Sequence, residues 1–377
     1  MGVLDTKIGL LGGGQLGRML VQSGIDFNLS IAVMDNDPDA PCRPLVNDFT
    51  VGNLLDYQNV LDFGRNYDLI TIEIEKVNTN ALKQLRKEGK IVYPEPECLE
   101  IIQDKRKQKL FYSSNGISTP EFILTETQAD IASAEFFPAV HKLGRDGYDG
   151  RGVRIINTQD DILKGFNKPG VLERYIPFEK ELSVVAARGT QGTTMTFPVV
   201  EQSMHPEKNL VEFLFSPADI PDDVEKRARL LAKEVITKFN LTGLLAVEMF
   251  LLEGGGLLVN EVAPRPHNSG HQTIEGNTTS QFEQHWRSVL GLPLGNTEIV
   301  KPSAMINLLG EDGFQGQVLY SGLDEVLRHK DVHLHLYGKK ETRPFRKMGH
   351  ITVLSEKADS LRSKALNIKN TIRIRSL

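Results

Sequence analysis

The segment Leu244–His271, LLAVEMFLLEGGGLLVNEVAPRPHNSGH, decides the expected fold. Two aliphatic and β-branched runs, LLAVEMFLL and LLVNEV, flank Glu253–Gly256, whose glycines are typical of a β-hairpin turn. A turn centred on the first two of these glycines places Glu248 directly opposite Glu261, with Cβ atoms ~5 Å apart on one face of the sheet. A one-residue bulge would instead send the two glutamates to opposite faces, and the sequence leaves both arrangements open.

Two directly opposed carboxylates repel each other, so the aligned arrangement predicts a cation between Glu248 and Glu261. Hard oxygen ligands without a nearby thiolate favour Mg²⁺ or Mn²⁺, and Asn260 adds a candidate carbonyl ligand. The residues that follow, Ala263–His271, bring an arginine and two histidines directly behind the hairpin. This combination indicates an active-site segment.

The chain has 377 residues and a formal net charge of −5. This length predicts two or three domains, each with its own core. The negative charge argues against general binding to a phosphate backbone, so nucleic acid is not an expected partner. No apolar run approaches the ~20 residues that span a bilayer, and the N-terminal residues enter a strand pattern instead of a cleavable signal. Cys42 and Cys98 show neither metal-ligand spacing nor a disulfide framework, so we expect a cytoplasmic protein without membrane association.

Strand and helix patterns alternate at the start of the chain. The runs KIGLL, IAVMD, DLITIEI and IVYP predict strands, with helices from Gln15, near 57–65 and near 78–88, so residues 1–104 are expected to form a parallel α/β domain. A charged linker helix and short strands around a glycine-rich loop then predict a small mobile subdomain over 105–181. Residues 182–377 carry longer strands, a helix over 222–239 and a small terminal subdomain. The fold class is therefore α/β combined with α+β.

The motif LGGGQLGRM, Leu11–Met19, has glycines at GxGxxG spacing between a strand and a helix, with Asp35 at the end of the next strand. A nicotinamide-dependent dehydrogenase is one interpretation. Backbone N–H groups at a helix N-terminus also suit any phosphate or ribose phosphate. A tight strand-to-helix turn without a ligand is a third interpretation.

A second glycine-rich loop, GRDGYDGRGV, occupies Gly144–Val153 after an expected strand that ends near Lys142. Such a loop can close over phosphates, because its amides and cations neutralise a triphosphate. A solvated hairpin tip is the alternative interpretation. Lys105 and Lys142 are lone cations that gain significance only from these neighbours.

Two further segments and two single residues are compatible with either a site or a solvated surface. Extended backbone at LERYI, Leu172–Ile176, can pair with an adenine edge, while Glu181 follows at a position suited to ribose hydroxyls. RPFRKMGH, Arg343–His350, concentrates cations in a chain of net negative charge and predicts an anion site. A charge run is usually a solvated face, and Glu181 and His205 are equally explained as surface residues.

The ordered series GGGQLGRM, GYDGRG, VEMF, NEVAPRPHNSGH, SQFEQH, INLLG and RKMGH resembles the ATP-grasp superfamily. Within it, the chain resembles the N5-carboxyaminoimidazole ribonucleotide synthetase family, the ATPase-type carboxylating subunit of phosphoribosylaminoimidazole carboxylase. The resemblance covers nearly the whole chain, and NEVAPRPHNSGH separates this family from other ATP-grasp ligases. Many members have glycine at the position of Phe345, glutamine at Val153 and asparagine at Lys76, which bears on the tail loop and on substrate contacts of the first domain.

The resemblance implies an ATP-grasp fold with an N-terminal parallel α/β (pre-ATP-grasp) domain, a small mobile ATP lid and a larger C-terminal sheet domain. It also implies a homodimer, ATP bound between the lid and the large sheet, and magnesium held by Glu248 and Glu261. The ATP-binding residues that it implies are Lys105, Lys142, Gly147, Tyr148, Asp149, Gly150, Arg151, Gly152, Val153, Glu173, Arg174, Tyr175, Ile176, Glu181, His205, Asn260 and Glu261.

The family reaction joins bicarbonate to 5-aminoimidazole ribonucleotide at the expense of ATP, in de novo purine (IMP) biosynthesis. Carboxyphosphate, or carbon dioxide released from it, must meet the amine before water does, so a closed lid is expected. The residues expected to act in catalysis are Tyr148, Asp149, Arg151, Arg265, His267 and Lys347. Those expected to bind the ribonucleotide are Gln15, Leu16, Glu73, His267, Asn268, Ser269, Lys340, Arg343 and Arg346.

Three other functions compete with this one. Another ATP-grasp enzyme, such as a formate-dependent glycinamide ribonucleotide transformylase or a carboxylase of a different acceptor, would use a similar fold. A nicotinamide-dependent dehydrogenase would use the first glycine motif, but it leaves the glutamate pair and the tail cations unexplained. A nucleotide-binding regulatory module without turnover would not need the metal and lid residues.

Overall fold

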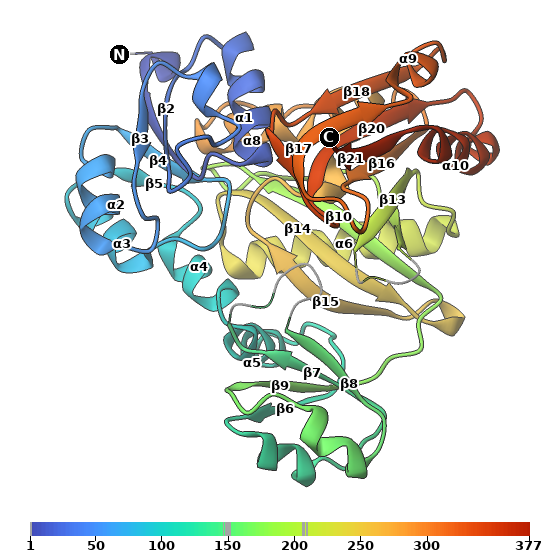
Figure 1. Ribbon diagram of the computed structural model, residues 1–377. Coiled ribbons are helices and arrows are strands. Elements are labelled where there is room, and N and C mark those ends of the chain that lie inside the picture. Colours follow the sequence, from blue (N-terminus) through green and yellow to red (C-terminus); the bar gives the residue numbers. More distant parts are fainter. Residues whose placement is uncertain (1, 146, 148–151, 206–207, 209) are drawn as a thin grey trace.

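The computed structural model describes residues 2–145, 147, 152–205, 208 and 210–377, and Figure 1 shows a first domain, a large central sheet and a smaller lid sheet. The first domain is built on a parallel sheet in the order β3-β2-β1-β4-β5. Its strands are β1 (Lys7–Leu11), β2 (Ser30–Asp35), β3 (Phe49–Val51), β4 (Leu69–Ile72) and β5 (Ile91–Val92). Its helices are α1 (Gln15–Asp26), α2 (Tyr57–Gly64), α3 (Thr79–Lys87) and α4 (Pro96–Ile102).

This first sheet confirms the expected parallel α/β architecture. Every residue of β4, and every residue of β1 after Lys7, is buried, as expected for strands covered by helices on both faces. The strand predicted from DLITIEI is shorter than expected. It ends at Ile72, so Glu73 and Glu75 lie beyond the end of β4. Helix α4 was not expected from the sequence.

The lid sheet is antiparallel, in the order β6-β9-β7-β8, and follows helix α5 (Lys105–Ser114). Its strands are β6 (Phe122–Thr125), β7 (Ala139–Leu143), β8 (Val153–Ile156) and β9 (Gly170–Arg174). A small apolar core of its own includes Ile131, Phe136 and Leu172. The side chain of Tyr112, on α5, instead belongs to the core of the large sheet. The lid sheet is thus a separate packing unit, whereas α5 is attached to the large sheet.

The large sheet follows the order β15-β14-β10-β12-β13-β16-β20-β18, with β11 beside β10. Its strands are β10 (Lys180–Arg188), β11 (Thr194–Thr196), β12 (Val200–Met204), β13 (Val211–Ser216), β14 (Gly243–Leu251), β15 (Leu257–Ala263), β16 (Ser303–Leu309), β18 (Val332–Leu336) and β20 (Lys347–Leu354). Helix α6 (Asp222–Phe239) covers one face through residues such as Ala228, Ala232 and Ile236. The remaining elements are α7 (Thr273–Gly276), α8 (Gln281–Val289), α9 (Leu323–Val326), α10 (Leu361–Thr371) and a small sheet of β17 (Gly316–Ser321), β19 (Glu341–Thr342) and β21 (Arg373–Ser376).

The first domain and the large-sheet region share one hydrophobic core. Side chains of α1 such as Met19 and Leu20 pack with Phe282 and Trp286 of α8. The indole Nε1 of Trp286 also donates a hydrogen bond to the carbonyl oxygen of Leu20 at 2.9 Å. Figure 1 shows α1 and α8 side by side at this junction. The position of the first domain against the large sheet is therefore fixed by apolar packing.

Among the described residues, none of the helices combines the length and the apolar character that crossing a bilayer requires.

Candidate active site

The β14–β15 hairpin aligns the two glutamates as predicted, but by a different route. Leu251 pairs with Leu257, so the turn is centred on Gly254 instead of between Gly254 and Gly255. The register then shifts by one residue at Asn260, and Glu248 pairs directly with Glu261. The expected turn centre was therefore wrong by half a residue, and the bulge restores the alignment.

The bulge also decides which side chains face the site. Val259 and Val262 both lie in the core under the sheet, although they are three residues apart. Side chains of a regular strand alternate between its two faces. Two residues that are three positions apart can share a face only if one of the residues between them is the inserted residue of a β-bulge. Asn260 and Glu261 are both half-buried on the face away from this core. The alternative in which a bulge separates the glutamates is wrong, because this bulge keeps them together and adds Asn260.

The opposed carboxylates have pKa values shifted in opposite directions. Burial, and then the neighbouring Glu261, raises the pKa of Glu248 above its usual range. The ammonium group of Lys105, which forms an ion pair with Glu261, lowers the pKa of Glu261. Gln202 Nε2 donates to Glu248 Oε1 at 3.2 Å. The pair concentrates negative charge that a divalent cation would neutralise, and its hard oxygens suit Mg²⁺.

Lysines from α5 and the lid sheet contact this hairpin, and Figure 1 shows α5 and the lid sheet on the side of the large sheet where β15 lies. Lys142, on β7, donates to Asn260 Oδ1 at 2.8 Å and to Glu173 Oε2 at 3.1 Å. Although burial opposes its ionisation, the lysines Lys142 and Lys109 lower the pKa of Glu173. The lysines thus connect α5 and the lid sheet to the edge of the large sheet that carries the glutamates.

The segment expected at the adenine lies at the end of β9. The amides of Arg174 and Tyr175 donate to the carbonyl oxygens of Glu121 and Pro138, and the Arg174 side chain is exposed in an ion pair with Glu121. Glu181 lies on β10, where burial raises the pKa of its carboxyl group. Glu181 thus lies on the strand next to β14, whereas the Arg174 side chain is exposed and paired with Glu121.

His205, expected near the nucleotide, contacts the tail loop. The His205 ring packs edge-on against the Phe345 ring, with the centroids 5.9 Å apart.

The segment after β15 connects the hairpin to the first domain. The Arg265 guanidinium forms a two-point ion pair with the Glu75 carboxylate. Burial opposes ionisation of Glu75, but Arg265 lowers its pKa. Sequence reasoning singled out Glu73 in this stretch and missed Glu75.

His267 is held as a neutral imidazole beside Glu248. Burial, followed by the charges of Arg265 and Lys347, lowers the pKa of His267 to about 3. The Ser269 amide donates to His267 Nδ1 at 3.3 Å, so the ring proton is on Nε2, which lies 3.5 Å from Glu248 Oε1. Ser269 Oγ lies 2.8 Å from Ser183 Oγ. Asn268 Nδ2 is buried and has no hydrogen-bond partner among the described residues.

The first glycine motif is occupied by carboxylates of the chain itself. The Gly13 amide donates to Asp35 at 2.5 Å, and the amides of Gly14 and Gly17 donate to Glu73 at 3.1 and 2.9 Å. Burial raises the pKa of Glu73. Because the chain's own carboxylates engage the amides of these three glycines, those amides are not available to a pyrophosphate, and this favours the tight-turn interpretation over a dinucleotide. Gln15 lies at the start of α1, and Leu16 is buried behind it.

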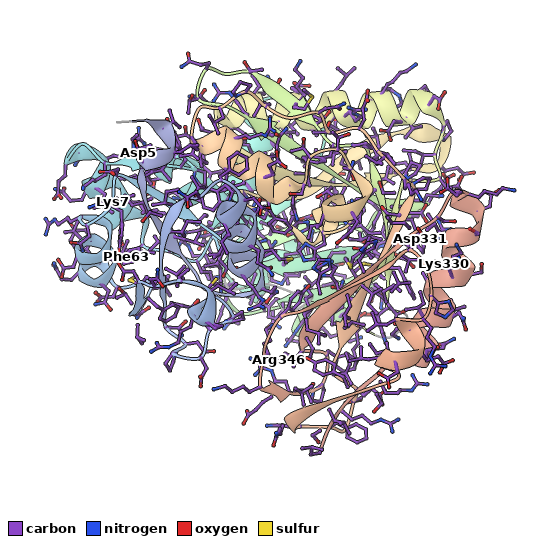
Figure 2. All side chains as sticks on the ribbon, turned by 90° about the horizontal axis from the view of Figure 1, so that it is seen from above. Asp5, Lys7, Phe63, Lys330, Asp331 and Arg346 are labelled. Carbon is purple, nitrogen blue, oxygen red and sulfur yellow. The ribbon has the colours of Figure 1, made fainter. Side chains whose placement is uncertain are left out.

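The cationic tail loop, residues 337–346 between β18 and β20, lies next to the first domain. Lys340 is exposed and pairs with Asp39 at 2.7 Å, and Arg346 donates to the carbonyl oxygen of Glu341 at 2.7 Å. Figure 2 shows Arg346 on the side of the C-terminal region nearer the first domain, and Lys330 on the far side. Arg343 is exposed, and Lys347 begins β20.

Phe345 and Lys339 are informative residues of the same loop. Phe345 has a φ of 61°, which glycine adopts without strain and which explains why glycine suits this position. Lys339 was missed by sequence reasoning: it donates to Gln15 Oε1 at 3.0 Å, and burial lowers its pKa to about 7. Its position beside α1 depends on the tertiary fold, and no local motif marks it.

The lid-loop residues Tyr148, Asp149, Gly150 and Arg151 lie outside the described residues. Gly147 is described, Gly152 has a φ of 82°, and Val153 begins β8.

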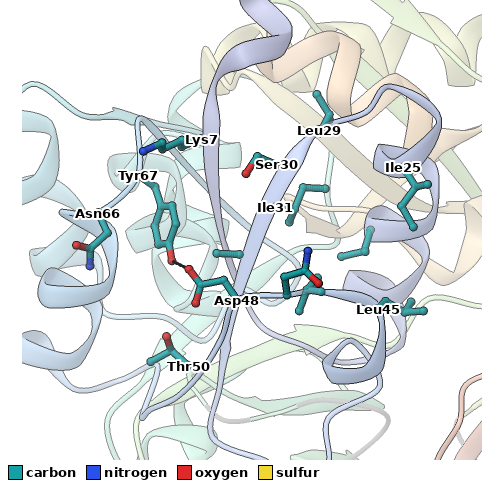
Figure 3. Close-up of a pocket in the computed structure, with 14 residues that line it drawn as sticks. Lys7, Ile25, Leu29, Ser30, Ile31, Leu45, Asp48, Thr50, Asn66 and Tyr67 are labelled. Carbon is teal, nitrogen blue, oxygen red and sulfur yellow. Dashed lines mark hydrogen bonds between the residues drawn. The ribbon is translucent and has the colours of Figure 1, made fainter.

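A hollow of about 740 Å³ lies elsewhere, at the amino ends of the first-domain strands. Figure 3 shows Tyr67 and Asp48 joined by a hydrogen bond there, with an O–O distance of 2.6 Å. None of the candidate site residues lines it, because the glycine motif lies at the opposite, carboxyl edge of the same sheet.

A parallel first domain, an antiparallel lid and a glutamate-bearing hairpin approached by lysines define an ATP-grasp ligase. Family models agree: a ribonucleotide synthetase preATP-grasp domain matches residues 5–103, an ATP-grasp domain matches 110–282, and a phosphoribosylaminoimidazole carboxylase C-terminal domain matches 303–364. The chain belongs to the N5-carboxyaminoimidazole ribonucleotide synthetase family.

Individual relatives support this assignment. The N5-carboxyaminoimidazole ribonucleotide synthase of Bacillus subtilis is 37% identical over 93% of this chain and 92% of its own length. The crystal structure of the Thermotoga maritima synthetase matches with a TM-score of 0.92 at 39% identity, covering 99% of this chain and all of that one. An Aspergillus clavatus synthase in complex with ADP and 5-aminoimidazole ribonucleotide matches with a TM-score of 0.90 at 30% identity, covering 98% and 99% of the two chains. The chain spans about two thirds of the length of the fungal phosphoribosylaminoimidazole carboxylases that it also matches.

Proposed function

We propose that this chain catalyses the ATP-dependent carboxylation of 5-aminoimidazole ribonucleotide by bicarbonate. The products are N5-carboxyaminoimidazole ribonucleotide, ADP and phosphate, in de novo purine biosynthesis. The observation that carries the proposal is the Glu248–Glu261 pair, faced by lysines from α5 and the lid in a chain of this family. Such an arrangement can position a triphosphate and neutralise the charge that develops during phosphoryl transfer.

ATP is proposed to bind between the lid sheet and the β14–β15 hairpin. Lys105 and Lys142 would exchange their carboxylate and amide partners for phosphate oxygens. The backbone at 173–176 would contact the adenine, Glu181 the ribose, and His205 the nucleotide site.

Magnesium, or manganese in its place, is proposed to bind to Glu248 and Glu261, with Asn260 beside them. The opposed carboxylates, with burial and Glu261 raising the pKa of Glu248, fit a site in which a divalent cation would stabilise the ionised form of both groups. The bound cation would neutralise negative charge on the β- and γ-phosphates. Lys105 already places a positive charge against Glu261, and the Lys105 ammonium could move to the phosphates as the metal binds.

Bicarbonate is proposed to lie near Arg265, Lys347 and the neutral His267. Glu75 orients the Arg265 guanidinium, so an anion would meet a cation with a fixed direction. Phosphoryl transfer to bicarbonate gives carboxyphosphate, and the closed lid would exclude water from it. Asp149, Arg151 and Tyr148 are proposed to complete this pocket from the lid loop.

The ribonucleotide is proposed to bind between the first domain and the tail loop. Arg343 and Arg346, with Lys340, would contact its phosphate, while Gln15, Leu16 and Glu73 would lie at its ribose or base. His267, Asn268 and Ser269 would form the wall facing the reacting amine. We further propose a homodimer that acts in the cytoplasm, where the buried free thiols Cys42 and Cys98 would stay reduced.

ADP release by the purified protein tests this function. Bicarbonate and 5-aminoimidazole ribonucleotide would be added separately and together to ATP and Mg²⁺, with formate plus glycinamide ribonucleotide as the control. We expect strong release only when both are present. Release that requires bicarbonate but not this ribonucleotide would indicate another acceptor, and release that requires formate would indicate a transformylase.

A further inference from the structure

Lys109, on α5, is a buried lysine that the proposed function leaves without a role. Its side chain is only 3% exposed, and its ammonium lies 3.2 Å from Glu173 Oε2. It also donates to Thr119 Oγ1 at 2.5 Å, and Thr119 Oγ1 in turn donates to the carbonyl oxygen of Val259 on β15. Lysines are almost never so deeply buried unless they are paired, so a specific interaction must hold this one.

Glu173 receives two cations on the same oxygen. Lys142 lies 3.1 Å and Lys109 3.2 Å from Glu173 Oε2. One carboxylate needs only one of these charges for neutralisation. Lys142 is also shared with Asn260, whereas Lys109 has a second partner, Thr119, that carries no charge.

The geometry points to Lys109 as a positioning residue that keeps Glu173 neutralised when Lys142 moves to an ATP phosphate. This inference rests on the proposed function, because it requires ATP at this site. If Lys142 moves away from Glu173, the buried Glu173 carboxylate stays neutralised only when a second cation remains in contact with it. Without Lys109, nucleotide binding would leave the Glu173 carboxylate buried and unpaired, which is strongly unfavourable.

A purely structural role for Lys109 gives a different expectation. The Lys109–Thr119–Val259 chain connects α5 to the hairpin, so its loss would lower stability. ATP affinity of the protein that remains folded would then be unchanged. The two roles are separated by measuring affinity in the presence and absence of the Glu173 charge.

Calorimetric titration with ATP and Mg²⁺ of the full chain tests the inference. Lys109→Met should raise the dissociation constant of ATP at least ~10-fold in the parent background and less than ~3-fold in the E173Q background, where nothing needs neutralising. Lys109→Arg, which keeps the charge, should remain close to the parent. Lys369→Met removes an α10 lysine that pairs with Glu212 on β13; it is the control and should bind ATP normally.

Each outcome has a defined meaning. Equal weakening by Lys109→Met in both backgrounds, or no weakening in either, would overturn the inference. Failure of the parent itself to bind ATP would instead reject the proposed function. If Lys109→Met does not fold, Lys109→Gln retains a donor for Thr119 without the charge and replaces it in the same comparison.

Discussion

Glu248 and Glu261 face each other on neighbouring strands, yet their environments shift their pKa values in opposite directions. Lys105 stabilises the charge of Glu261, while burial and the neighbouring charge disfavour ionisation of Glu248. The structure therefore already contains one cation against one carboxylate. A second positive centre beside Glu248 would lower its pKa and favour ionisation of both carboxylates.

Glu261→Gln should reduce ATP turnover by at least ~100-fold while the protein remains folded, because it removes the carboxylate that Lys105 and the proposed metal share. The measurement is Mg²⁺-dependent ADP release together with circular dichroism. Glu253→Gln, an exposed change in the turn of the same hairpin, is the matched control. Near-normal turnover of Glu261→Gln would refute the proposed metal site.

Glu75→Gln should raise the KM for bicarbonate by roughly 10-fold or more, because Arg265 would lose the partner that fixes its direction. The KM for ATP should change much less. Glu88→Gln removes a similar two-point partner from Arg65 on the surface of the same domain and should affect neither constant. A parallel rise of both KM values would indicate a general disturbance and not an oriented Arg265.

At the level of elements, the first glycine motif shows how a local pattern can mislead. Its spacing matches a dinucleotide fingerprint, but Asp35 and Glu73 accept the hydrogen bonds that a pyrophosphate would need. The close approach depends on glycine: a Cβ on Gly12 would lie 2.6 Å from Glu73 Cγ. The element is thus a tightly packed turn that positions the start of α1.

Gly12→Ala should lower the thermal midpoint more than Gly89→Ala. Both glycines have positive φ, 99° and 87°, so both changes introduce backbone strain. A Cβ at Gly89 would have no atom of the other described residues within 4 Å, its two chain neighbours aside, whereas one at Gly12 overlaps Glu73. We expect the overlap to cost a further ~1–3 kcal/mol, which paired melting curves would measure. Equal thermal midpoints for the two variants would show that the Glu73 side chain moves aside for the added Cβ without a loss of stability.

The hairpin is the element that sequence predicted best. Opposed glutamates followed from turn composition and strand alternation, and the structure confirms their pairing. The bulge at Asn260 could not be placed, because turn length and bulge position compensate each other in the register. Helix α4 was missed between the predicted strand IVYP and the charged helix.

At the scale of the whole molecule, the parts differ in how they are held. The first domain shares its apolar core with α8, whereas the lid sheet packs on a small core of its own. Polar contacts such as Lys142 to Asn260 connect the lid to the hairpin. Apolar burial fixes the first domain, and we expect the lid to move when these polar contacts exchange.

Hydrogen exchange should therefore be faster in the lid strands β6–β9 than in β1 and β4 when nucleotide is absent. ATP with Mg²⁺ should slow exchange in the lid and leave β1 and β4 almost unchanged. Mass spectrometry of peptic fragments would measure both. Equal protection of the two sheets, or a lid unaffected by nucleotide, would contradict this division.

The sequence predicted the architecture but not every contact within the candidate site. Ordered motifs were sufficient for the fold and the family, because each has a distinctive local composition. Lys109 was missed because it lies in a charged helix, where a lysine is normally solvated. Glu75 was missed because Glu73 and Glu75 look equivalent in the alternating sequence pattern. The strand β4 in fact ends before both of them, at Ile72, so the sequence does not show which contacts each side chain makes. These contacts depend on segments far apart in sequence.

The core shared by α1 and α8 bears on how such enzymes could be recombined. Residues 1–104 look like a module that could be transplanted between relatives, but Trp286 and Phe282 complete its hydrophobic interior from far along the chain. A chimera with a foreign first segment would inherit a mismatched surface at Met19 and Leu20. The exchangeable unit is therefore discontinuous in sequence. A graft of residues 1–104 would succeed only if α8 were transferred with them.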